Sequence, residues 1–227
     1  SINTIAICER PSLTTLNGLG VIVDNYLIPG KVYKKYVKKN SSFLYKESIN
    51  MDFWRLKYFK ELETYNLSNK DFHNSINTKK DISSYENKIV ILGWYLNSDL
   101  PNYFINERAN EEFFNIIESL SSAFQKYAVI LRMKMLNIEE GNLISERFKN
   151  KNNIFLCNNY QTLGLSYHLC KEASLIVSIP TSLAEESIAY GKKVIFIDDL
   201  YTIKNISSYL YPKEFKFSIA KNTNHLI

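Results

Sequence analysis

Apolar and polar residues form blocks of two kinds over the second half of the chain. Short runs that are apolar throughout predict buried strands at residues 88–96, 127–135, 152–158, 174–179 and 193–197. Blocks with apolar residues at every third or fourth position predict helices at residues 107–126, 141–150, 163–173 and 183–190. Strands that alternate with helices in this way indicate right-handed βαβ units and a parallel sheet. We therefore predict an α/β fold with a Rossmann-like parallel sheet.

The first part of the chain has a mixed pattern, which predicts a second, partial α/β domain at the N-terminus. Strands are predicted at residues 2–8 and 21–28, and helices over residues 31–66. In the second helix, apolar residues recur at helical spacing and predict a packing surface: Phe53, Leu56, Phe59 and Leu62.

A polar, turn-rich stretch at residues 66–87 is the best candidate for a linker. We divide the chain accordingly into an N-terminal domain with its linker (1–85), a second domain (86–200) and a tail (201–227). The tail is expected to pack back toward the N-terminal domain. Because the chain begins without Met inside a predicted strand, we expect a fragment of a longer protein.

The composition narrows the class of function. With 45% hydrophobic and 22% charged residues among 227, the chain is expected to be globular. The net charge of +5 is mild and accompanies no base-reading motif, so we expect no nucleic-acid partner. The run Lys31–Lys39 predicts a solvated helix face or, alternatively, a patch that contacts phosphate or a membrane. Three cysteines without C-x-x-C spacing favour a reducing cytoplasm and predict neither a metal site nor a disulfide framework.

The stretch Ser178-Ile179-Pro180-Thr181-Ser182 is the strongest candidate site. It closes a predicted buried strand and opens a predicted helix, and open α/β sheets bind ligands at such carboxyl strand ends. Pro180 presets the turn, and Thr181 or Ser182 can cap the helix. The unpaired N–H groups of a helix start bind phosphate, and hydroxyl groups add donors. The alternative is an ordinary helix cap that binds nothing.

Four more residues are candidates because of their positions. Glu186 lies one turn into the same helix and can bind a ribose diol; the alternative, which we prefer for Glu185, is an acidic residue that favours the helix dipole. Arg132 ends a strand at the binding edge and can supply a cation for phosphate; Lys134 is a less favoured choice for this role, and the alternative for either is a plain surface cation. Gly93 permits a close approach of a ligand, or forms a plain turn. Tyr160 follows the third strand, at the same edge of the sheet.

The segment S-I-P-T-S-L-A-E-E-S-I-A-Y-G-K-K-V-I-F-I-D resembles the donor-binding half of GT-B glycosyltransferases. In that family a small-residue turn holds the donor phosphates, and a Glu five residues before a Gly binds the ribose. Glu186 and Gly191 have this spacing. The resemblance also implies that residues 86–200 form the donor-binding domain, that residues 1–85 belong to the acceptor-side domain, and that Tyr160 stacks on the donor base. The resemblance covers residues 88–200 and is greatest to bacterial capsule and lipopolysaccharide transferases that use CMP-activated Kdo or sialic acid. Residues 131–135 depart from it, because many relatives carry a His-Pro pair there.

The resemblance implies transfer of a sugar from a nucleotide-activated donor to a growing surface polysaccharide or lipopolysaccharide. It implies a donor as co-substrate, no cofactor, no metal, a glycan or lipid-linked glycan acceptor, and a cytoplasmic location with peripheral contact to the membrane. The general base of inverting relatives is an acceptor-domain Asp or Glu. Glu9, Asp24 and Asp52 are available, but none lies in a motif, so we name no catalytic residue. The alternatives are a nucleotide-sugar epimerase, a polyol-phosphate transferase, or an inactive nucleotide-sugar-binding module.

Overall fold

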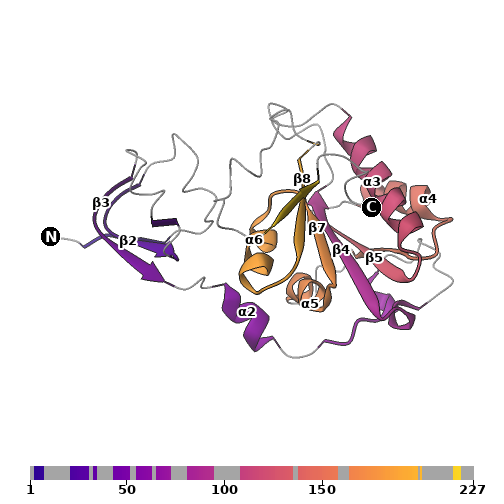
Figure 1. The fold of residues 1–227 in the computed structure, drawn as a ribbon, viewed down its shortest axis with the longest axis horizontal. Coiled ribbons are helices and arrows are strands. Elements are labelled where there is room, and N and C mark those ends of the chain that lie inside the picture. Colours follow the sequence, from indigo (N-terminus) through magenta and orange to yellow (C-terminus); the bar gives the residue numbers. More distant parts are fainter. Residues whose placement is uncertain are drawn as a thin grey trace.

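Two parallel sheets make up the fold of the computed structural model (Figure 1). The structure describes residues 3–7, 21–30, 33–34, 43–51, 55–62, 65–72, 81–94, 108–134, 138–157, 164–198, 200 and 217–220. The larger sheet has six strands, and the smaller, N-terminal sheet has three and lies apart from it in both views. The predicted α/β class with a parallel sheet is confirmed.

The larger sheet is entirely parallel, with strand order β6-β5-β4-β7-β8-β9. Its strands are β4 (Asn87–Trp94), β5 (Tyr127–Lys134), β6 (Ile154–Cys157), β7 (Leu175–Ser178), β8 (Val194–Ile197) and β9 (Ser218–Ala220). In order along the chain this is 3-2-1-4-5-6, the doubly wound order of dinucleotide-binding sheets. Strand β9 lies in the predicted C-terminal tail. The described part of that tail thus extends this sheet, which differs from our expectation that it packs toward the N-terminal domain.

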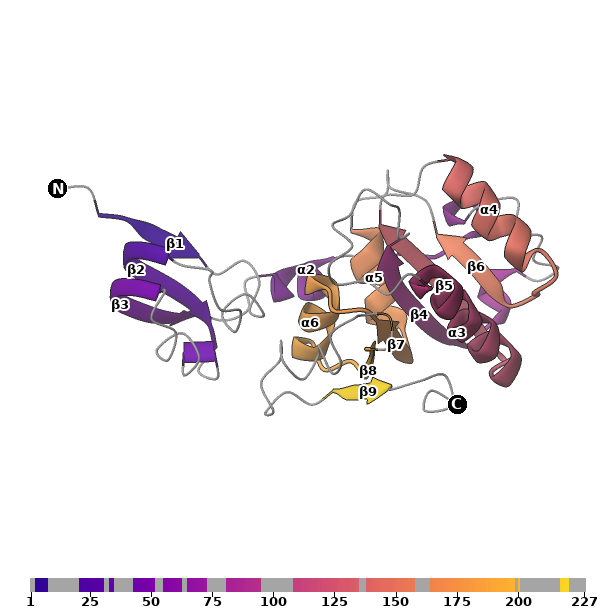
Figure 2. The same ribbon diagram turned by 90° about the horizontal axis from the view of Figure 1, so that it is seen from above.

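Helices cover both faces of the larger sheet (Figure 2). One face carries α3 (Ala109–Ala123) and α4 (Ile138–Phe148), and the other carries α2 (Leu56–Glu61), α5 (Leu165–Glu172) and α6 (Ser182–Ala189). Alternate residues of each strand enter different cores, so that Ile89 and Ile91 pack under α3 whereas Val90 and Leu92 pack under α5 and α6. Burial on both faces explains why these strands are apolar throughout.

The polar stretch before β4 is anchored to this domain by apolar residues. Two short 3₁₀ helices, η2 (Asn69–Asp71) and η3 (Ile82–Ser84), lie in it. Phe72, Ile82 and Tyr85 are buried in the α5/α6-side core, as is Phe59 of α2. Phe72 also pairs with Cys157 and covers the edge of β6. Phe59 before the predicted linker and three residues within it thus share a core with the larger sheet, although the predicted domain boundary near residue 85 would assign them to the N-terminal domain.

The smaller sheet has strand order β1-β2-β3, with β1 (Ile5–Ile7), β2 (Val21–Pro29) and β3 (Phe43–Met51) all parallel. The prediction of helix for residues 31–66 is wrong over β3, where side chains alternate as in a strand. The apolar residues there recur at every second position in part of the segment only, and the basic residues nearby favoured a helical interpretation. Helix is correct at Leu56–Glu61, and its buried Phe59 confirms part of the predicted packing surface.

Candidate functional site

The strand order reverses between β4 and β7, whose carboxyl ends are neighbours. Leu92 pairs with Ser178, and the backbone N–H of Ile179 donates to the Leu92 carbonyl oxygen at 3.3 Å. The chain leaves β4 toward α3 on one face of the sheet and leaves β7 toward α6 on the other. In doubly wound sheets, ligands bind outside the carboxyl strand ends at this reversal. The Ser178–Ser182 turn lies there.

The strand register brings two predicted residues to one level of the sheet. Ser178 pairs with Leu92, Leu92 pairs with Arg132, and Arg132 pairs with Cys157. All four residues belong to the α5/α6 face, because they continue the alternation of the residues in that core. Since neighbouring strands are about 4.8 Å apart, the Cα atoms of Ser178 and Arg132 lie roughly 10 Å from each other.

The turn caps α6 as the sequence indicated. Thr181 is the N-cap residue, with φ −136° and ψ 155°, and its Oγ1 accepts a hydrogen bond from the Ala184 N–H at 3.2 Å. The Ser178 hydroxyl donates to the Ile179 carbonyl oxygen and lies 3.4 Å from Thr181 Oγ1. Helix geometry leaves the N–H groups of the first helical residues without intrahelical acceptors. The half-buried Ser182 therefore offers both an N–H and a hydroxyl at the positive end of the helix dipole.

Arg132 reaches from β5 to the start of α5. Its Nε donates to Ser166 Oγ at 2.8 Å and its Nη1 to the Cys157 carbonyl oxygen at 3.4 Å. Ser166 lies in the first turn of α5, where the helix dipole is positive. A cation and a helix start repel each other in isolation, but both attract an anion placed between them.

Glu186 is held inside the protein. It is 1% exposed, and its Oε1 lies 3.2 Å from Nη1 of Arg55, which precedes α2. Its Oε2 accepts a hydrogen bond from the Tyr167 hydroxyl of α5 at 2.7 Å. Burial and this hydrogen bond raise the pKa of Tyr167 above its usual range. Glu186 thus connects three helical segments, and its predicted contact with a ribose stays a prediction. Glu185, which we interpreted as a dipole-favouring residue, is fully buried.

Gly191 ends α6 in a left-handed conformation, with φ +95°. Its N–H donates to the Ile188 carbonyl oxygen at 2.9 Å, and the Lys192 N–H donates to that of Ser187 at 2.9 Å. These two bonds form a Schellman motif, in which glycine is the favoured residue because it has no Cβ. The glycine stop predicted from the sequence is therefore present. The spacing of Glu186 and Gly191 also has a local explanation, since it is set by where α6 ends.

No protein-family model matches this chain, and a search of curated proteins finds no significant match. The resemblance to GT-B glycosyltransferases thus depends on the quoted sequence segment alone.

Gly93 lies at the same edge but faces the opposite side of the sheet. A Cβ atom built on Gly93 would lie 2.6 Å from Cζ of Phe113 in α3, a side chain that is 2% exposed. The group that approaches this glycine closely is thus a core phenyl ring of the chain itself. Tyr160, the remaining predicted contact, lies outside the described residues.

Replacing Gly93 by alanine is expected to lower the free energy of unfolding by about 1–3 kcal/mol, because the added methyl group overpacks the core against Phe113. Denaturant unfolding measures this loss. Combining the change with Phe113→Leu is expected to cost less than the sum of the two single changes, since the shorter side chain relieves the contact. Strictly additive losses would contradict this explanation of Gly93.

Asp24 is a poor general base in this structure. Its carboxylate accepts hydrogen bonds from the Thr4 N–H at 2.9 Å and the Thr4 hydroxyl at 2.8 Å, and it pairs with Lys46. The Lys46 ammonium and the Thr4 donors hold the pKa of Asp24 well below its usual range. A carboxylate so stabilised gains little by taking a proton. Glu9 and Asp52 lie outside the described residues.

Among the residues that the structure describes, no group of three or more His, Cys, Asp or Glu side chains is arranged to hold a metal ion. Within the same residues, no helix combines the length and the apolar character needed to cross a membrane. Cys157 and Cys170 are buried, free thiols, and burial raises the pKa of Cys170 to about 12.

The sequence interpretation missed the residues that α5 contributes. Gly164 begins this helix with φ +74°, and a Cβ there would lie 2.8 Å from Cδ2 of Leu62. The glycine therefore allows both the left-handed cap and the close packing of α2 on α5. A glycine at the predicted start of a helix could have indicated this cap and the close packing around it. The partners Ser166 and Tyr167 follow it directly, but nothing in the sequence indicated that they meet Arg132 and Glu186.

Proposed function

We propose that this chain binds a nucleotide-activated sugar at the carboxyl edge of the six-stranded sheet and forms the donor domain of a glycosyltransferase. The observation that carries the proposal is the reversal of strand order between β4 and β7, with the Ser178–Ser182 turn at that point. The resemblance of the same turn to the donor-phosphate turn of GT-B enzymes supports it. The acceptor would be a glycan or a lipid-linked glycan of surface polysaccharide synthesis.

In this proposal the donor phosphate contacts the start of α6. The N–H and the hydroxyl of Ser182 donate hydrogen bonds to it, while Thr181 fixes the helix start and Ser178 buttresses Thr181. Arg132, at the same level of the sheet, adds positive charge beside the start of α5.

These groups would act when the bond to the nucleotide breaks. An acceptor hydroxyl attacks the anomeric carbon, the bond from this carbon to the phosphate oxygen breaks, and the nucleotide leaves with the electron pair. Negative charge grows on the phosphate in this step, and fixed N–H groups and a cation stabilise it without rearrangement. The hydroxyl proton goes to a base, a role for which Asp24 is poorly suited because its pKa is held low.

Calorimetric titration with CMP, UDP and GDP tests the binding step, and we expect at least one of the three to bind. The Ser182→Ala variant is expected to bind that nucleotide about tenfold more weakly, since a hydrogen bond to a charged group contributes roughly 1.5 kcal/mol or more. Ser174→Ala is the matched control, because Ser174 is exposed at the other end of β7 and bonds to Asn87. Its affinity should equal that of the unchanged chain.

The proposal is withdrawn if none of the three nucleotides binds, or if Ser182→Ala binds as tightly as the control. Release of free nucleotide from the matching nucleotide-sugar separates an active transferase from an inactive binding module. Binding without release, with or without a glycan acceptor present, would favour the module.

A further inference from the structure

A polar pocket lies at the end of the larger sheet opposite the proposed nucleotide site, at the amino ends of β4, β5 and β6. It has a volume of about 270 Å³. Its walls come from the last turn of α3, the turn between α4 and β6, and Tyr85 before β4: Ser121, Ser122, Gln125, Asn150, Lys151, Asn152, Asn153 and Tyr85. The proposed nucleotide site lies beyond the other ends of these strands, so the two sites are separate.

The floor of this pocket is built by a satisfied polar network. The Asn153 amide nitrogen donates to the carbonyl oxygens of Ser121, Phe124 and Tyr127 at 3.1, 3.2 and 3.1 Å. Its amide oxygen accepts a hydrogen bond from the Ser121 hydroxyl at 2.5 Å. Ser121 is 2% exposed and Asn153 6% exposed. Because every bond is already made, the floor is fixed before a ligand arrives, and ordering it costs no binding energy.

The rim carries amide groups that are available to a ligand. Gln125, Asn150 and Asn152 are exposed, and their side-chain amides make no hydrogen bond to another residue of the described chain. Each amide offers two N–H donors and an oxygen acceptor. A sugar hydroxyl both donates and accepts, so a row of amides matches neighbouring hydroxyl groups better than it matches an anion or an apolar group.

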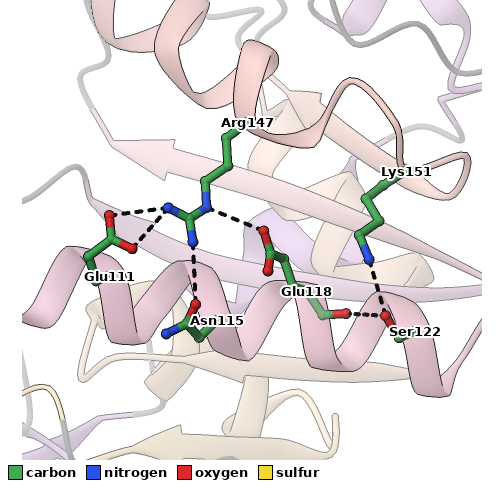
Figure 3. A network of polar contacts seen from close by, with 6 residues as sticks. All are labelled: Glu111, Asn115, Glu118, Ser122, Arg147 and Lys151. Atoms are coloured by element: carbon green, nitrogen blue, oxygen red, sulfur yellow. Dashed lines mark hydrogen bonds and ion pairs between the residues drawn. The ribbon is translucent and has the colours of Figure 1, made fainter.

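Among the described residues that line the pocket, Lys151 is the one with a charged side chain, and its charge has a local explanation. Its Nζ donates to Ser122 Oγ at 3.2 Å, and Ser122 lies in the last turn of α3 (Figure 3). A cation is favoured there because the carboxyl end of the helix dipole is negative. The pocket therefore has no strong surplus of positive charge, which favours a neutral ligand.

The two helices that border this pocket, α3 and α4, are joined through the side chain of Arg147. Arg147 of α4 donates to Glu111 at 2.9 and 3.1 Å and to Asn115 at 3.3 Å, and it pairs with Glu118 (Figure 3). All three partners belong to α3. These largely exposed contacts link α3 to α4, the helices that lead into two walls of the pocket.

We propose that this pocket binds a neutral hexose, either free or as the terminal residue of a glycan, through the amides of Gln125, Asn150 and Asn152. The volume, slightly below the roughly 300–1,000 Å³ of drug-sized ligand pockets, fits one sugar residue and not a longer chain. This inference does not depend on the proposed nucleotide site.

Saturation-transfer NMR with glucose, galactose, mannose and N-acetylglucosamine at millimolar concentrations tests this inference. We expect at least one of these sugars to receive saturation from the protein. The double variant Asn150→Ala, Asn152→Ala is expected to weaken that binding about tenfold, and both exposed positions should leave the unfolding midpoint unchanged. Asn142→Ala is the matched control, because this exposed amide lies on α4 outside the pocket and should have no effect on the sugar.

Two further experiments distinguish this pocket from the proposed nucleotide site, and a neutral sugar from an anionic ligand. Ser182→Ala should bind the hexose normally, so failure at the nucleotide site and failure here are independent results. The inference is overturned if no hexose of the panel binds, if the double variant binds it as well as the Asn142→Ala control, or if only inorganic phosphate or glucuronate binds, through Lys151.

Discussion

The Asn153→Asp variant is expected to lose about 3 kcal/mol or more of its free energy of unfolding. The amide nitrogen of Asn153 donates to three backbone carbonyl oxygens, and a carboxylate of the same shape would present an oxygen to all three. Those carbonyl groups belong to the end of α3 and the start of β5, so the change removes the hydrogen bonds that hold the turn between them. A buried charge that faces like partial charges costs more than the loss of neutral hydrogen bonds.

Denaturant unfolding of Asn153→Asp at several pH values tests this expectation with a clear sign. The pKa of the introduced carboxyl should be higher in the folded than in the unfolded chain, because burial and the facing oxygens disfavour its charged form. The loss of stability should therefore be smallest at acidic pH, where the group is protonated in both states, and should grow as the pH rises through its folded pKa. Asn150→Asp is the matched control, since Asn150 is exposed, and should stay within about 0.5 kcal/mol of the parent. Equal losses in the two variants would contradict a structural role for Asn153.

Asn153 also marks how far the sequence could predict the fold. The five apolar runs each became a strand of the larger sheet, and all four amphipathic blocks became helices, because burial on two faces leaves a continuous apolar signal. β9 carries three residues, too few for a pattern to be recognised. The strand order depends on contacts between distant segments, which local periodicity does not encode. Nor does periodicity reveal that Asn153, one Asn among many, bonds to both the end of α3 and the start of β5.

The candidate site was predictable for the same local reasons and no further. Ser178, Thr181 and Ser182 follow from the adjacency of a strand, a turn and a helix, and the cap that Thr181 forms confirms that part. The placement of Arg132 on the same level required the register of three strands. The partners of Glu186 lie far from it along the chain: Arg55 is 131 residues away and Tyr167 is 19 residues away. An acidic residue in a helix gives no sign of such a partner.

The Arg55→Met variant is expected to lose about 2–3 kcal/mol of its free energy of unfolding. Methionine keeps an apolar stem of similar length but removes the cation that faces Glu186, a carboxylate that is 1% exposed. Removing one member of a buried ion pair typically costs about 3–5 kcal/mol, and the estimate here is lower because the Arg55 side chain is 21% exposed. The loss should appear in the unfolding of the larger domain, since Glu186 belongs to α6.

A double-mutant cycle with Glu186→Gln separates the ion pair from the packing of Arg55. If the carboxylate is the reason for the loss, Arg55→Met should cost clearly less in the Glu186→Gln chain, giving a coupling energy of about 1–2 kcal/mol. The same cycle on Arg147 and Glu111, a pair whose Glu111 side chain is 65% exposed, should give at most about 1 kcal/mol. A coupling no larger than in this exposed pair would mean that Glu186 is solvated when Arg55 is absent. Glu186 would then be accessible enough to meet a ribose, whereas a large coupling would identify it as the residue that joins α2 and α5 to α6.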